Sequence, residues 1–233
     1  MQKILKNGFD QLGLPCSKEI LGQYKTYYDY LTERNAVMNL TAISGEDNVA
    51  RLHFLDSAAL CKVYDFKNKS LIDIGTGAGF PGLPLKIIQP SIKLTLLDSH
   101  QKRVTFLSEL CEKLEIDDVK CLAARAEDEV SHIGGSFDAA VSRAVARLNI
   151  LCELCLPFVH VGGVFIAMKG PDCSNELKEA APAISVLGGR LQRVWEYVIP
   201  GTDITHTAVV IEKIKPTPPA YPRQFGQIKK KPL

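Results

Sequence analysis

The amino-acid sequence predicts an α/β fold: a mostly parallel sheet of seven strands, preceded by a helical extension. From residue 69 onward, short apolar runs typical of buried strands alternate with longer segments of helical periodicity. Strands that alternate with helices form parallel sheets covered on both faces. A glycine-rich loop after the first of these strands supports the same fold, because such loops join strand to helix in nucleotide-binding proteins.

The first 66 residues contain no strand-like run. Leu5, Phe9 and Leu12 recur at near-helical intervals, and a second helical series runs from Ile20 to Leu31. We therefore expect residues 1–66 to form an N-terminal helical extension packed on the core.

Residues 67–214 are predicted to form the core. We expect strands at 70–74, 93–97, 119–122, 137–142 and 164–168, and helices at about 81–89, 100–114, 147–156 and 174–187. Segments 190–198 and 206–213 are predicted as a closing pair of strands. The loop between them is short enough for an antiparallel connection.

Residues 215–233 break this pattern. They hold five prolines, five basic residues and no acidic residue. Such a composition favours an extended, basic, proline-rich C-terminal tail that adds nothing to the core.

The overall composition is that of an ordinary globular protein, with 46% hydrophobic and 23% charged residues. A net charge of +2 means that any nucleic-acid contact must come from local clusters of basic side chains. Seven cysteines and no apparent secretory leader favour reduced thiols and a cytoplasmic location. We expect a monomer without membrane contact. Cys152 and Cys155 lie in an apolar run, which favours core packing over a metal site.

The most informative motif covers residues 71–82, where an apolar strand ends in Asp73 and opens into a glycine loop. Gly75, Gly77 and Gly79 stand at alternate positions, and their missing side chains allow a nucleotide-like ligand close to the backbone. A dinucleotide fingerprint would read G-x-G-x-x-G, so the spacing disfavours an NAD oxidoreductase. The motif resembles the first motif of class I S-adenosylmethionine (SAM) methyltransferases, which have a Rossmann-like fold.

A second acid, Asp98, ends the next predicted strand, 19 residues beyond Gly79. The ribose-binding acid of a nucleotide-binding βαβ unit is expected at about this distance. A carboxylate there can accept hydrogen bonds from both ribose hydroxyls. The loop and Asp98 together favour a nucleoside-type cofactor over an empty strand-to-helix turn.

Further segments, in their order and spacing, resemble a single family. They are Glu33-Arg34-Asn35, Asn39-Leu40-Thr41, the run from His53 to Ser57, Asp98-Ser99-His100, Lys102-Arg103, Arg125-Ala126-Glu127, the run from Ser142 to Ala146, Lys169-Gly170 and Tyr221-Pro222-Arg223. Over essentially its whole length the chain resembles the bacterial small-subunit rRNA methyltransferase G family, also called glucose-inhibited division protein B. The resemblance implies SAM-dependent methylation of N7 of one guanosine in a conserved loop of 16S rRNA. The expected partner is the small ribosomal subunit or an assembly intermediate.

The glycine loop and the resemblance together define an expected cofactor site. Its predicted residues are Asp73, Gly75, Gly77, Gly79, Phe80, Asp98, Ser99, His100, Ala126, Glu127 and Arg143. By resemblance, Gly75 and Phe80 line the methionine and adenosine side of SAM, and Ala126 and Glu127 lie beside the adenine. Arg143 follows the fourth strand and is expected to face the reaction centre as a positioning residue.

Basic side chains are the expected contacts to RNA phosphates. The candidates are Arg34, Lys102, Arg103, Arg125, Arg143, Arg147, Lys169, Arg223 and the run Lys229, Lys230 and Lys231. For Lys102, Arg103 and the lysine run, a solvated surface is the alternative interpretation. His53 and Asp56 share one helix face, where a structural hydrogen bond explains them as well as an active-site role.

Two other functions stay open on the residues alone. A small-molecule SAM methyltransferase would use the same loop, but the basic tail and the spread of arginines would then be unexplained. A non-catalytic RNA-binding regulator with a SAM-type fold is disfavoured because the acids and glycines of the cofactor site are retained. Guanine N7 has a lone pair and no proton to lose, so the leading hypothesis predicts no nucleophile–base pair.

Overall fold

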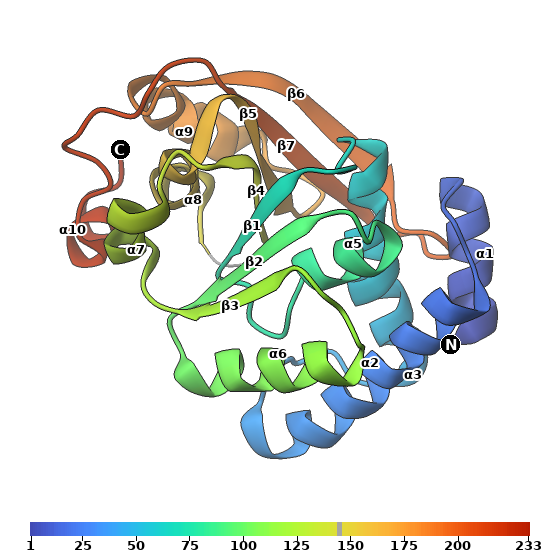
Figure 1. The fold of residues 1–233 in the computed structure, drawn as a ribbon. Coiled ribbons are helices and arrows are strands. Elements are labelled where there is room, and N and C mark those ends of the chain that lie inside the picture. The colour runs from blue at the N-terminus through green and yellow to red at the C-terminus, as the bar shows by residue number, and fades with distance from the viewer. Residues whose placement is uncertain (144–145) are drawn as a thin grey trace.

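The computed structural model describes residues 1–143 and 146–233 (Figure 1). Its centre is a seven-stranded sheet with the strand order β3-β2-β1-β4-β5-β7-β6. Strands β1 to β5 run parallel, whereas β7 is antiparallel to both of its neighbours, β5 and β6. The predicted fold class and the antiparallel closing pair are confirmed. Ala144 and Val145, which belong to the segment from Ser142 to Ala146, lie outside the described residues.

All seven predicted strands are present. They are β1 (Ser70–Ile74), β2 (Lys93–Asp98), β3 (Val119–Ala123), β4 (Phe137–Arg143), β5 (Val159–Lys169), β6 (Gly189–Val198) and β7 (Thr205–Lys213). Strand β5 starts at Val159, earlier than predicted, because the glycine pair at 162–163 interrupts the sequence pattern from which the start of the strand was predicted. A bulge in this region shifts the register between β4 and β5.

The helices include two that are absent from the prediction above, α7 and α10. In chain order they are α1 (Gln2–Leu12), α2 (Lys18–Met38), α3 (Glu46–Val49), the π-helix η1 (Ala50–Leu55), α4 (Asp56–Ala58), the 3₁₀ helix η2 (Ala59–Lys62), α5 (Gly82–Ile88), α6 (Gln101–Lys113), α7 (Ala126–Ile133), α8 (Leu148–Cys155), the 3₁₀ helix η3 (Leu156–Phe158), α9 (Ser174–Val186) and α10 (Phe225–Lys230). Helix α7 is short, and it packs on the second apolar cluster described below through Ala126, Val130 and Ile133. None of the helices in the described ranges is long and apolar enough to cross a membrane.

Two apolar layers enclose the sheet. Alternate residues of β1 face opposite layers: Leu71 belongs to one cluster, and Ile72 and Ile74 belong to the other. The first cluster includes buried residues of α1, α2, α5 and α6, and the second includes those of α8, α9 and α10. The N-terminal helices therefore cover the same face of the sheet as α5 and α6 (Figure 1).

The N-terminal helices reach the glycine loop through two fully buried tyrosines of α2. The Tyr27 hydroxyl donates to the carbonyl oxygen of Ala78 (2.6 Å), and the Tyr24 hydroxyl donates to that of Pro84 (2.9 Å). A Cβ on Gly79 would lie 2.6 Å from the Tyr27 hydroxyl. Gly79 is therefore required for packing against α2 as well as for its positive φ of 101°.

The C-terminal segment is not the detached tail that its composition predicts. Helix α10 packs against α8, and Ile228 is fully buried. Arg223 donates two hydrogen bonds to the fully buried carboxylate of Glu153, at 2.8 and 2.6 Å. The prediction that this segment adds nothing to the core is wrong, because Tyr221, Phe225 and Ile228 recur at helical spacing and all pack on the second cluster.

Candidate cofactor and active site

A cavity of about 550 Å³ opens beside the carboxyl ends of β1, β2 and β4. Its size lies within the range of small-molecule sites. Helix α5, which follows β1, packs in one layer and α8, which follows β4, packs in the other. The cavity therefore lies where the sheet changes its direction of winding, which is the usual ligand crevice of such sheets.

The glycine loop forms the floor of this cavity. Gly75, Thr76 and Gly77 line it, and Gly75 and Gly77 have positive φ values of 70° and 60°. Asp73 lies behind the loop: its Oδ2 accepts hydrogen bonds from the Thr76 hydroxyl and the Gly82 N–H, both at 2.8 Å. Burial raises the pKa of Asp73 to about 6, although these two hydrogen bonds oppose the shift. Asp73 holds the loop in shape and is not itself among the lining residues.

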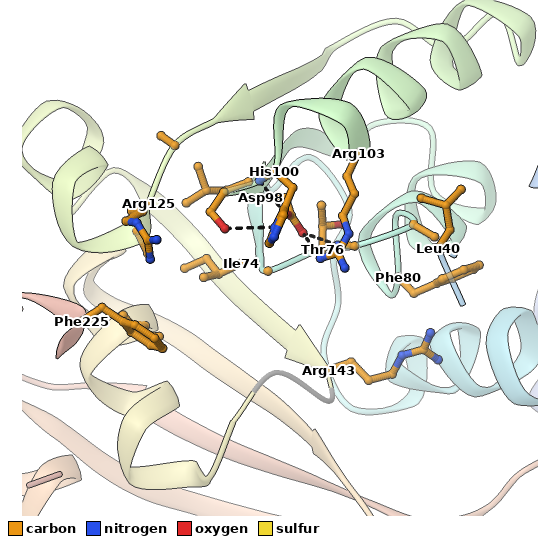
Figure 2. A pocket seen from close by; sticks show the side chains of 18 of the residues that line it. Leu40, Ile74, Thr76, Phe80, Asp98, His100, Arg103, Arg125, Arg143 and Phe225 are labelled. Atoms are coloured by element: carbon orange, nitrogen blue, oxygen red, sulfur yellow. Dashed lines mark hydrogen bonds and ion pairs between the residues drawn. The ribbon is translucent and has the colours of Figure 1, made fainter. Parts of the chain in front are cut away.

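Asp98 lines the cavity beside the loop and is almost fully buried. Its carboxylate accepts from the backbone N–H groups of Gly77 (3.0 Å) and His100 (2.9 Å). The His100 ring (3.0 Å) and the Arg103 guanidinium (3.3 Å) also contact it, as Figure 2 shows. Both of these side chains are partly exposed to solvent, whereas Asp98 is buried.

The far side of the cavity is lined by residues from three further segments. Ala126 and Glu127 begin α7, Leu154 lies on α8, and Phe225 begins α10. Arg125 and Phe225 face the cavity from this side, opposite Arg143 and Phe80 (Figure 2). We call His100, Arg103, Arg125 and Phe225 the exposed end of the cavity.

The opposite end is built around Arg143, the last residue of β4. Its guanidinium donates to the Leu52 carbonyl oxygen (3.1 Å), to Asp56 Oδ2 (3.2 Å) and to His53 Nδ1 (2.7 Å). The His53 ring stacks on Phe80 with centroids 4.2 Å apart, and Arg143 lies over the same ring. We call Thr41, His53, Phe80 and Arg143 the buried end of the cavity.

His53 lies in the π-helix η1 and Asp56 directly follows it, three residues later in the chain. Asp56 N–H donates to the carbonyl of Arg51, five residues earlier, so the helix is locally wider than an α-helix. Asp56 is fully buried, and its Oδ1 also accepts from the Tyr197 hydroxyl (2.7 Å) and approaches His206 Nδ1 (2.9 Å). A buried carboxylate is stable only with such partners.

Electrostatics keep His53 neutral. Burial, and then the charge of Arg143, lower the pKa of His53 to about 3. The imidazole is therefore uncharged at neutral pH and accepts a hydrogen bond at Nδ1 from the guanidinium, which has no acceptor atom.

The structure places the predicted site residues in three groups. Those that line the cavity are Gly75, Gly77, Phe80, Asp98, Ser99, His100, Arg103, Arg125, Ala126, Glu127 and Arg143. Asp73 and Gly79 support the loop from behind. The remaining basic candidates lie outside the cavity. Leu40 and Thr41, which belong to a segment that carries the resemblance, and Leu154 and Phe225 also line the cavity, although none of them was predicted as a site residue.

Several basic candidates for RNA contact are held in ion pairs. The pairs are Arg34 with Glu109, Arg147 with Glu179, Lys169 with Glu176 and Arg223 with Glu153. By contrast, Lys102 and the lysine run at 229–231 are exposed. A role of any of these side chains in RNA binding stays a prediction.

Sequence reasoning noticed His53 and Asp56 but could not find their partner. Arg143 lies about 90 residues away in the chain, and only the folded sheet brings it to η1. Phe225 had a usable signal, namely its helical spacing from Tyr221 and Ile228. Within residues 1–143 and 146–233, no group of three or more metal-ligating side chains is present.

Comparisons with known proteins agree with this geometry. Solved structures with the same fold include a SAM-dependent methyltransferase from Aquifex aeolicus (18% identical, TM-score 0.53, covering 69% of this chain and 91% of that one). Another is TYW2 from M. jannaschii in complex with AdoMet (12% identical, TM-score 0.55, covering 68% and 75%). At these identities the likeness concerns the fold alone.

Relatives in sequence are much closer. The small-subunit rRNA methyltransferase G of Alkaliphilus metalliredigens is 49% identical, over 99% of this chain and 98% of its own. The enzyme of the same name from Clostridium perfringens is 42% identical over the same shares. The family model described as rRNA small subunit methyltransferase G matches residues 20–203. The chain therefore belongs to the rRNA small subunit methyltransferase G family.

Proposed function

We propose that this protein transfers the methyl group of SAM to N7 of a guanosine in 16S rRNA, within the small ribosomal subunit or an assembly intermediate. The observation that carries the proposal is a single cavity with a nucleoside-binding loop and acid at one side and a rigid Arg143–His53–Phe80 cluster at the other. Its family relatives are named for methylation of small-subunit rRNA.

The residues present fit SAM. A Cβ built on Gly77 meets no protein atom within 4 Å, so the loop leaves open space above its backbone. Asp98 stands beside this space to accept from ribose hydroxyls, and the side chains around Ala126 and Phe225 offer an apolar wall for the adenine. When bound, SAM supplies a methyl group already activated by a positively charged sulfur.

The chain's own residues contribute positioning. Guanine N7 carries no proton, so no side chain has to act as a general base. His53 is in any case a weak base, because its pKa is lowered to about 3 and its Nδ1 already accepts from Arg143. Arg143 is held by three partners, which fixes the wall against which the base would lie. Positioning of two reactants can contribute several kcal/mol to a barrier.

The RNA must bring its base to the cavity in an accessible form. The N7 edge of a guanine lies in the deep, narrow major groove of an RNA duplex and cannot be reached there. A loop nucleotide turned out of its stack would fit. Exposed Arg125 at the cavity rim and Lys102 nearby at the start of α6 are suited to hold the flanking phosphates.

The direct test is methyl transfer from radiolabelled SAM to small ribosomal subunits that lack the modification, followed by nucleoside analysis. We expect the label in 7-methylguanosine of the 16S rRNA. Absence of label on subunits and naked rRNA, with SAM binding intact, would favour a small-molecule substrate instead. Loss of RNA affinity with added salt would separate these alternatives, because phosphate contacts release counterions.

The cofactor site is tested by Gly77→Val with Gly135→Val as its matched control. Both glycines have positive φ, 60° and 66°, and open space around their Cβ positions, but only Gly77 lines the cavity. Both variants should lose about 1–2 kcal/mol of stability through backbone strain. Isothermal titration should find SAM binding abolished in Gly77→Val alone. Normal SAM affinity in folded Gly77→Val would contradict the placement of the cofactor on this loop.

A further inference from the structure

Arg143, His53 and Thr41 form a chain of hydrogen bonds at the buried end, and the donor and the acceptor of each bond can be assigned. A guanidinium only donates, so His53 Nδ1 accepts from Arg143 at 2.7 Å. The ring is neutral, so its single N–H proton is on Nε2. Nε2 lies 2.8 Å from Thr41 Oγ1 and must donate to it.

Thr41 is thereby left with only one hydrogen-bonding role. Its Oγ1 accepts from His53 Nε2–H and also from the backbone N–H of Ile43, at 3.0 Å. A hydroxyl has two acceptor lone pairs and one proton. Both acceptor positions are filled, so the hydroxyl proton can only be donated. Within the described part of the chain, no further hydrogen bond of Thr41 Oγ1 is present.

The position of Thr41 is fixed on its other side as well. Asn35 accepts from the Thr41 backbone N–H (2.8 Å) and donates to the Thr41 carbonyl oxygen (3.0 Å). Thr41 is half-buried and lines the cavity together with His53, Phe80 and Arg143. A rigid donor therefore stands at the wall of the buried end.

We propose that the Thr41 hydroxyl donates a hydrogen bond to O6 of the target guanine and makes the site selective for guanine over adenine. The inference rests on the proposed function. The edge of guanine that carries N7 also carries O6, so both of its groups are acceptors. Adenine presents an amino group at the same place. Thr41 has no free lone pair to accept from that amino group, and it therefore leaves adenine unpaired.

The test compares two bases and three proteins. Small subunits are reconstituted with 16S rRNA that carries either guanosine or 2-aminopurine at the methylated position; 2-aminopurine keeps N7 but has hydrogen in place of O6. Single-turnover methyl transfer is measured for the wild type, Thr41→Val and Thr41→Ser. On guanosine, Thr41→Val should be about tenfold slower, the effect of one lost hydrogen bond, and Thr41→Ser should stay near the wild type. On 2-aminopurine, the wild type and Thr41→Val should be equally slow.

A purely structural role of Thr41 gives a different result. Loss of the hydroxyl would then slow transfer to both bases by the same factor, which would overturn the inference, as would full activity of Thr41→Val on guanosine. If transfer to 2-aminopurine is too slow to follow, the same comparison is made on subunit affinity in the presence of S-adenosylhomocysteine. No transfer by the wild type to guanosine would instead overturn the proposed function itself.

Discussion

The two ends of the cavity are built in different ways. At the buried end, the Arg143 side chain is 14% exposed and bound to three partners. At the exposed end, His100 and Arg103 are 65% and 38% exposed and both contact the carboxylate of Asp98, and the His100 ring also lies 3.2 Å from the Ser99 hydroxyl. The buried end holds one geometry, whereas the exposed end can change its contacts when a ligand arrives. Rigidity is thus concentrated where a methyl group would be transferred, and adaptability where a nucleoside would enter.

The largest effect should come from breaking the buried end at its centre. In Arg143→Lys the charge stays, but one ammonium group cannot reach Leu52, Asp56 and His53 in the same way as a planar guanidinium. A shift of the reacting groups by about 1 Å can cost about 100-fold in rate, so we expect a loss of this size in methyl transfer. Arg147→Lys is the control, since Arg147 pairs with Glu179 at an exposed position. Equal losses in the two variants would mean that the loss does not come from the contacts of the buried end.

A smaller effect should appear as a dependence of stability on pH. The pKa of His53 is about 3 in the folded protein and about 6.5 in an unfolded chain. Below about pH 6.5, His53 binds a proton in the unfolded chain but not in the folded protein. The free energy of unfolding therefore falls as the pH falls. From about pH 7.5 to about pH 5.5, wild type should lose about 1.4 kcal/mol relative to His53→Gln.

Urea unfolding of both proteins at the two pH values measures this difference. The pKa of Asp73 is raised to about 6, so Asp73 acts in the opposite direction, and it cancels because both proteins contain it. Glutamine can accept from Arg143 and donate to Thr41, which preserves the chain of contacts. A constant difference across this range would mean that folding does not lower the pKa of His53.

Loss of the Tyr27 hydrogen bond behind the glycine loop should have a smaller effect than changes at the buried end. In Tyr27→Phe, the carbonyl of Ala78 loses its buried donor, at a cost of about 1–2 kcal/mol of stability. Tyr24→Phe removes the equivalent bond to Pro84 and should cost a similar amount. Of the two acceptor residues, Ala78 lines the cavity and Pro84 does not. Titration should therefore show weaker SAM binding in Tyr27→Phe alone. Equal SAM affinities would mean that α2 stabilises the fold without shaping the loop.

The same contrast explains how far the sequence predicts this molecule. The seven strands and the glycine loop are local patterns, and a few consecutive residues suffice to recognise them. The contacts of Arg143 with His53 and Asp56 join segments about 90 residues apart, and only the folded sheet brings these segments together. The loop side of the site is therefore predictable from the sequence. At the buried end, Phe80 and Arg143 are predicted as site residues, but the contacts that join Arg143 to His53 and Asp56 are not.

The C-terminal segment shows a different limit. Its prolines and lysines outweigh its few apolar residues in composition, so it is predicted as a tail. The segment nevertheless packs on the core, through three apolar side chains at helical spacing and one ion pair to buried Glu153. Composition describes the average residue of a segment, whereas packing depends on particular ones.

The smallest effect is expected at the exposed end, where the informative result is whether SAM affinity rises or falls. The His100 ring occupies Asp98 Oδ1, while the His100 backbone N–H holds the same atom independently of the side chain. His100→Ala removes a group that a ribose hydroxyl must displace, so SAM should bind up to about threefold more tightly, since exposed pairs are worth less than about 1 kcal/mol. Exposed His132, outside the cavity, provides the control variant His132→Ala. Weaker binding in His100→Ala would show that the ring contacts the cofactor directly and that the exposed end does not yield to it.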